Sequence, residues 1–252
     1  MTSVDPGVRT DLRPAPFRSR ATAFADALSQ AVDLVLPREC AGCGRPGFAL
    51  CPACRVALSA EVVHPFVAPV SGLPLQAAAH YAGVTRAALL AHKEHRQTSL
   101  AVPLGRVLAA AVSRSPAVIE CGAAWLIAVP SGRGVDRVRG ARPLAEITGQ
   151  ALRTLRKAGY LVGRCEPVAS GRRNDQVGLS VEQRWSNLTG SMRARAFRVP
   201  AGIPILLVDD IVTSGATLTE LARALQDVGR PASGAAVIAA AGHRVAGPSG
   251  SR

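Results

Sequence analysis

The sequence predicts an α/β fold built on an open, mostly parallel sheet. Three apolar runs have the length of strands, and they lie at 124–129, 205–208 and 235–241. Amphipathic segments of helical length follow the first two runs, at 143–158 and 217–229. Apolar strands that alternate with helices are typical of a parallel sheet whose two faces are both covered. No segment repeats along the 252 residues.

The N-terminal half is predicted to start with a disordered arm and a short helix. Residues 1–20 are rich in Arg, Pro, Ser and Thr, and apolar residues at helical spacing then occupy 22–36. Prolines divide residues 60–82 into short strands, the last of them around 76–81. Residues 84–114 are predicted as a helix, a break and a second helix that opens near Pro103, because proline suits a first helical turn.

The C-terminal half alternates loops with the predicted core elements. A basic loop at 133–142 follows the first apolar strand, and a polar stretch at 180–195 is compatible with a helix. The last helix is expected to end at Gly229, a residue type that commonly terminates helices. The expected organisation is a disordered arm (1–20), a helix with a Cys-rich module (21–60), an α/β domain (75–242) and a disordered tail (243–252).

Four of the six cysteines form two C-x-x-C pairs separated by seven residues. The four are Cys40, Cys43, Cys51 and Cys54. Two such pairs allow four thiolates to converge tetrahedrally on one structural Zn²⁺. Two disulfides are the alternative, but nothing in the sequence indicates export and the cytosol keeps thiols reduced, so zinc is favoured. Cys121 and Cys165 stand alone and are expected to be small buried hydrophobic residues.

Basic residues outnumber acidic ones by 30 to 17, a net charge of +13. They are dense between Arg133 and Arg198, where fourteen cations face five acids. Because Arg pairs bidentately with phosphate, this block favours a nucleotide, a sugar phosphate or a nucleic acid over a neutral ligand, with a solvated basic face as the alternative. No apolar run approaches the roughly 20 residues of a membrane span, and the N-terminus lacks a secretory signal. We therefore expect a cytoplasmic protein without membrane insertion.

The segment 205–218 carries the strongest functional signal. A buried strand leads to Asp209 and Asp210, and a loop of small and hydroxyl residues then precedes a helix. The loop residues are Thr213, Ser214, Gly215, Ala216 and Thr217. Ligands of open α/β sheets bind beyond the carboxyl ends of the strands, where loop amides and a helix N-terminus attract anions. Because two neighbouring acids would repel a bare phosphate, the pattern favours a phosphorylated sugar whose hydroxyls or Mg²⁺ meet the acids. An ordinary helix cap is the alternative, but it explains one hydroxyl residue and not two carboxylates.

Residues 205–218 resemble the phosphoribosyl-pyrophosphate (PRPP) motif of type I phosphoribosyltransferases. A longer stretch, about 40 to 240, is similar to the ComF family, which is linked with DNA uptake and competence and places a four-cysteine zinc module before such a domain. The shared features are Lys93 in a helix, Val129-Pro130 before an R-x-R-G stretch at 137–140, Gln176, and R-x-x-N at 184–187. The family often continues R-x-R-G with Phe-Asn-Gln, whereas Ala141-Arg142-Pro143 stands here.

The resemblance implies PRPP binding with Mg²⁺, with Asp209 and Asp210 as the catalytic pair at the ribose hydroxyls and residues 213–217 at the 5′-phosphate. The candidates for the pyrophosphate loop are Pro130, Ser131, Gly132, Arg133, Arg137 and Arg139. Two hypotheses remain open. The protein is an enzyme that transfers phosphoribosyl to a nitrogen acceptor, or it is a non-enzymatic sensor or scaffold of the DNA-uptake machinery that contacts single-stranded DNA or protein partners. Aromatic side chains for base stacking are few in the basic block, with Trp185 and Phe197 as the candidates.

Overall fold

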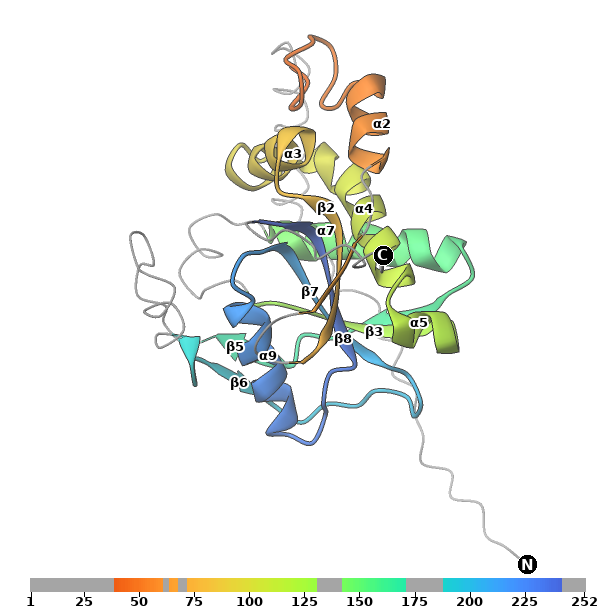
Figure 1. Cartoon of the computed structure of the whole chain (residues 1–252), viewed down its shortest axis with the longest axis vertical. Coiled ribbons are helices and arrows are strands. Elements are labelled where there is room, and N and C mark those ends of the chain that lie inside the picture. The colour runs from red at the N-terminus through yellow and green to blue at the C-terminus, as the bar shows by residue number, and fades with distance from the viewer. Residues whose placement is uncertain (1–38, 61–63, 68–71, 131–141, 171–187, 242–252) are drawn as a thin grey trace, which may run out of the picture. The chain divides into compact units, whose positions relative to one another are not determined.

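The computed structural model describes residues 39–60, 64–67, 72–130, 142–170 and 188–241. A six-stranded sheet with the order β1-β2-β8-β7-β3-β4 lies at its centre (Figure 1). The strands are β1 (His64–Val67), β2 (Pro74–His80), β3 (Ala123–Ala128), β4 (Leu161–Arg164), β7 (Ile205–Val212) and β8 (Gly234–Ala240). Strand β1 pairs antiparallel with β2, and the other four pairings are parallel. The open, mostly parallel sheet expected from the sequence is therefore confirmed.

Helices cover both faces of this sheet. Helices α3 (Gly83–Glu94), α4 (Ala101–Ser113) and α7 (Pro143–Lys157) pack with one face. Helix α9 (Ala216–Gln226) covers the other, together with a two-stranded sheet of β5 (Val168–Ser170) and β6 (Met192–Ala194). Strand β7 alternates between the two cores, because successive side chains of a strand point to opposite faces: Leu206 and Val208 enter the first core, and Ile205 and Leu207 enter the second.

Small residues allow the helices to pack closely on the α4 side. Helix α4 is rich in alanine and valine, and it makes extensive contact with α7. At Gly105 the backbone of α7 comes so near that an added Cβ would lie 2.4 Å from the Cβ of Gln150. The low aromatic content of the chain, 4%, is consistent with a core that is filled mainly by Ala, Val and Leu.

The Cys-rich segment packs into the first core. Helix α2 (Pro52–Ala60) starts directly after Cys51. Leu50, Leu58 and three of the clustered cysteines are buried in the same cluster as Ala88 and Leu89 of α3. The segment therefore rests on α3 through apolar contacts, and the division into domains drawn from the sequence stays a prediction.

Most of the predicted core elements are found near their expected positions. The helix–break–helix at 84–114 corresponds to α3, a 3-10 turn η1 (Thr98–Leu100) and α4. The short helix α5 (Pro116–Cys121) was not expected. Predictions for residues 1–38, 133–141 and 243–252 lie outside the described residues. Within the described ranges, the helices fall short of the length and apolar character that a bilayer crossing requires.

Three expectations from the sequence were wrong. The strand expected at 205–208 continues to Val212, because its pairing with β8 extends to Val212 and Ala240. The polar stretch at 180–195, which is compatible with a helix in sequence, ends instead in strand β6, since residues 192–194 pair with β5. Cys121 is exposed and Cys165 is partly exposed. Their thiols form polar contacts instead, with the Ala117 carbonyl oxygen and the Trp125 indole N–H respectively.

Candidate functional site

A pocket of about 480 Å³ opens at the carboxyl ends of the parallel strands. Val129 and Pro130 follow β3, Glu166 follows β4, and Asp209 and Asp210 lie near the end of β7. From β3 the chain passes through α7 to β4, and from β7 it passes through α9 to β8 on the other side. The neighbouring strands β3 and β7 therefore mark the place where the strand order reverses, which is where open α/β sheets bind ligands.

The two aspartates lie within the last half of β7 rather than in a loop after it. Each carboxylate accepts a hydrogen bond from the next amide along the chain, Asp209 Oδ1 from the Asp210 N–H and Asp210 Oδ1 from the Ile211 N–H, both at 2.9 Å. The second oxygen of Asp210 accepts a hydrogen bond of 3.1 Å from the Lys93 ammonium group of α3. These contacts fix the direction in which Asp210 presents its carboxylate to the pocket.

The surroundings of the two aspartates shift the pKa values of Asp209 and of Lys93. Burial raises the pKa of Asp209 well above its usual range, and the nearby carboxylate of Asp210 raises it further. Burial alone would lower the pKa of Lys93, but the carboxylates of Asp210 and Asp209 raise it above its ordinary value. The carboxylates therefore favour the charged form of Lys93, and the proton affinity of Asp209 is increased.

The loop after β7 borders the pocket through two of its residues, Thr213 and Thr217. Gly215 has φ +77°, a left-handed conformation that L side chains adopt at a cost, and it forms the N-cap of α9. The Ala216 amide lies 3.4 Å from the Ser214 hydroxyl, a long contact. Among the described residues, the amides of Gly215 and Thr217 donate to no carbonyl of the chain. Thr213 and Thr217 line the pocket, so the start of α9, where helix amides have no partner within the helix, borders it.

The opposite wall contains residues that the sequence motif did not identify. Arg142 pairs with Glu166 at 2.6 Å, and both line the pocket with Tyr81. Arg142 was part of the basic block, but nothing in the local sequence indicated Glu166 or Tyr81, since their place depends on how β4 and β2 pair in the sheet. Of the six candidates for the pyrophosphate loop, Pro130 lines the pocket. Ser131, Gly132, Arg133, Arg137 and Arg139 lie outside the described residues, as do Gln176 and the segment 184–187.

The four clustered cysteines converge as the sequence predicts. Their sulfur atoms all lie within 4.8 Å of one another, and Cys43 Sγ is 3.7 Å from Cys51 Sγ. Tetrahedral Zn–S bonds of about 2.3 Å would place sulfurs about 3.8 Å apart, so this spacing suits a bound zinc ion. A disulfide requires about 2.05 Å, and the four thiols are free. The cluster could therefore hold a structural metal such as zinc.

Hydrogen bonds and burial give these thiols different proton affinities. Burial would raise the pKa of Cys40, but amide hydrogen bonds, led by that of Cys51, lower it to about 6. Burial and the neighbouring sulfurs raise the pKa of Cys54 to about 12. Four thiolates cannot share so small a volume without a cation, because each one repels the next. A divalent metal would supply that charge, and the donor set of four sulfurs is typical of structural zinc.

Comparison with known proteins agrees with the fold. The sequence model of the family described as phosphoribosyl transferase domain matches residues 139–250. This region contains α7, β7, the loop at 213–217, α9 and β8. A search of curated proteins gave no significant match. The structure therefore combines a phosphoribosyltransferase-type α/β domain with a four-cysteine cluster.

Proposed function

We propose that the pocket binds PRPP, or a closely related phosphorylated ribose, together with Mg²⁺. The observation that carries this proposal is the arrangement at the end of β7, where Asp209 and Asp210 line one cavity together with Thr213 and Thr217 of the loop that opens α9. Carboxylates suit the ribose hydroxyls, whereas the amides of residues 213–217 and the start of α9 suit the 5′-phosphate. Neither group alone would select a sugar phosphate, but together they match its two ends.

The volume of the pocket and its charge are consistent with such a ligand. The cavity of about 480 Å³ falls in the size range of small-molecule sites. Lys93 and Arg142 contribute two positive charges to its lining, while Asp210 and Glu166 contribute negative charge. The charges of these four side chains cancel, so Mg²⁺ that enters with PRPP would balance part of the negative charge of the substrate.

As a transferase, the protein would act mainly by positioning. The bond between C1 of the ribose and the pyrophosphate oxygen breaks, and the pyrophosphate leaves with the electron pair. A nitrogen nucleophile forms the new bond to C1 and loses a proton. The residues of this chain would hold the ribose and the 5′-phosphate in place while the reaction centre changes, a contribution that can supply a large part of the rate enhancement.

Binding can be tested directly by calorimetry and thermal melting with PRPP and Mg²⁺. The wild-type protein should bind and its melting temperature should rise, because a ligand that binds the folded state stabilises it. Replacing Asp209 and Asp210 by Asn should remove most of this rise. The variant Arg106→Gln, on the exposed side of α4, provides a control that should bind normally. Absence of any shift in the wild type at millimolar PRPP would contradict the proposal.

We further propose that the protein is a ComF-type factor of DNA uptake whose basic residues bind single-stranded DNA. Support comes from Arg193, Arg195 and Arg198, which are exposed on and after β6. Binding of single-stranded DNA should weaken with salt, and replacing these three residues by Gln should weaken it at every salt concentration. Arg106→Gln again serves as the control. DNA binding that is unchanged in the triple variant would contradict this second proposal.

Transfer itself requires an acceptor. Release of pyrophosphate from PRPP should be measured with each nucleobase in turn, since a nitrogen acceptor should raise the rate above that of hydrolysis. A protein that binds PRPP but releases no pyrophosphate with any base would support the sensor or scaffold hypothesis rather than the enzyme.

A further inference from the structure

The pocket contains side chains from outside the region that matches the family. Lys93 of α3 and Tyr81 after β2 both line it, yet the family match begins at residue 139. Lys93 is in direct contact with the acid pair, because its Nζ lies 3.1 Å from Asp210 Oδ2. A helix from the N-terminal half of the chain therefore reaches the aspartates of β7.

The position of Lys93 is fixed by the residues around it. Its neighbour His92 is buried, and the ring nitrogens of His92 lie 3.2 Å from the Gln97 carbonyl oxygen and 3.3 Å from that of Pro143. Pro143 starts α7, so the C-terminal end of α3 is attached to a second helix that borders the pocket. Ala88, Leu89 and Ala91 anchor the inner side of α3 in the core. The backbone that carries Lys93 is thus held firmly, and its side chain is directed at the pocket.

The charge of Lys93 has a specific use at this place. Two adjacent carboxylates at the end of β7 repel each other, and an anionic ligand would repel both. The Lys93 ammonium group compensates the charge of Asp210, whose side chain is 20% exposed and is therefore only partly stabilised by water. A cation at this position allows the carboxylate of Asp210 to keep one orientation when the ligand arrives.

We propose that Lys93 is a positioning residue of the ribose subsite and that it acts through Asp210. This inference rests on the proposed function, because it assigns Asp210 to the ribose hydroxyls. It also extends the binding site to α3, a helix that the family match does not include. Loss of Lys93 removes the partner of Asp210 Oδ2 and leaves the carboxylate held through Oδ1 by the Ile211 amide, so that it can turn about this contact and away from the ligand.

Calorimetry with PRPP and Mg²⁺ on a set of full-length variants tests this role. Lys93→Met should bind about 10- to 100-fold more weakly, the usual effect of losing a charged hydrogen bond at a binding site. Lys93→Arg keeps the charge and should bind within a few-fold of the wild type. Lys157→Met removes an equal charge at the far end of α7 and should bind normally. Thermal melting without ligand checks that each variant is folded.

A double-mutant cycle separates positioning from direct contact. If Lys93 acts through Asp210, then Lys93→Met should change the affinity little in a protein that already carries Asp210→Asn. Additive losses would overturn the proposal, because they would mean that Lys93 contacts the ligand on its own. Wild-type affinity in Lys93→Met, or no rescue by Lys93→Arg, would overturn it as well. Failure of the proposed function can be told apart from failure of the Lys93 proposal, since the wild-type protein itself would then not bind PRPP.

Discussion

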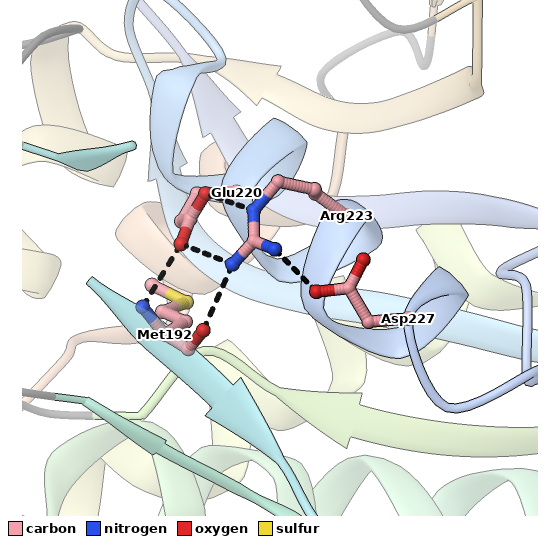
Figure 2. A network of polar contacts seen from close by, with 4 residues as sticks. All are labelled: Met192, Glu220, Arg223 and Asp227. Atoms are coloured by element: carbon pink, nitrogen blue, oxygen red, sulfur yellow. Dashed lines mark hydrogen bonds and ion pairs between the residues drawn. The ribbon is translucent and has the colours of Figure 1, made fainter. Parts of the chain in front are cut away.

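Replacing Glu220 by Gln would test what holds α9 against β6. Glu220 is 4% exposed, and one carboxylate oxygen accepts hydrogen bonds of 2.9 Å from both the Met192 amide and Arg223 Nη2 (Figure 2). The other oxygen accepts one of 2.8 Å from Arg223 Nε. Arg223 also donates to the Met192 carbonyl oxygen and pairs with Asp227. The network therefore joins α9, the helix that starts after the loop at 213–217, to the small second sheet.

The cost of this substitution can be estimated from the contacts it removes. A hydrogen bond to a charged group contributes about 1.5–3 kcal/mol, and Gln keeps one acceptor oxygen of the two. Arg223 is 38% exposed, so solvent screens part of the ion pair. We therefore expect Glu220→Gln to lower the free energy of unfolding by about 1–3 kcal/mol. For a chain of this size that corresponds to roughly 2–10 °C in melting temperature.

The stability that Glu220→Gln removes should depend on pH in a defined direction. Burial would raise the pKa of Glu220, but the Arg223 guanidinium and the Met192 amide lower it below the usual value. A carboxyl with a depressed pKa in the folded state stabilises the protein above its unfolded pKa of about 4.3. That stabilisation is lost as pH falls through the folded value. The difference between wild type and variant should thus be full at pH 7 and shrink below about pH 4.

Chemical denaturation of both proteins at several pH values measures this difference. Asp227→Asn provides a matched control on the same arginine, and because Asp227 is 59% exposed it should cost less than about 1 kcal/mol. Equal stability of wild type and Glu220→Gln at pH 7 would refute the estimate. A difference that persists undiminished at acid pH would refute the role of the ionised carboxylate.

Three further predictions concern packing and the cysteine cluster. Gly42→Ala should lower the zinc content of purified protein below about one per chain, because the added Cβ would lie 2.7 Å from Cys54 Sγ. Elemental analysis that finds full occupancy would exclude this clash. Gly105→Ala should reduce stability by about 1–3 kcal/mol through overpacking between α4 and α7, and an unchanged thermal melt would show that the helices can separate at little cost. Zinc chelation should weaken PRPP binding, since the cluster packs on α3, and identical affinity with and without chelator would argue against that link.

Local patterns in the sequence were sufficient for the main elements and for one side of the site. The strands at 124–129, 205–208 and 235–241 are continuous apolar runs, and the loop at 213–217 follows one of them closely. The acids and the small loop residues are neighbours in the sequence, so they could be identified together. The residue at which β7 ends could not be predicted from the sequence. The strand continues past Asp210 because it pairs with β8, which is a contact between distant segments.

The other side of the site depends on tertiary structure. Glu166 faces the pocket because β4 pairs with β3, and Tyr81 does so because β2 pairs with β8. Neither residue stands in a pattern that predicts a ligand. Lys93 was noted from the family resemblance, but its contact with Asp210 joins residues 117 positions apart. The exposure of Cys121 was also missed, since an isolated cysteine carries no signal for the surface on which it lies.

The matched region alone does not account for the site. Residues 139–250 include β7 and β4, but these strands do not pair with each other, because β3 lies between them at 123–128. Helix α4, which covers β2 and β8 on one face, also precedes the match. A fragment limited to residues 139–250 would expose the apolar face of β8 and would lack the strand that joins its two halves. The pocket therefore belongs to the sheet as completed by the N-terminal elements, because Tyr81, Lys93 and Val129 line it beside the aspartates of β7.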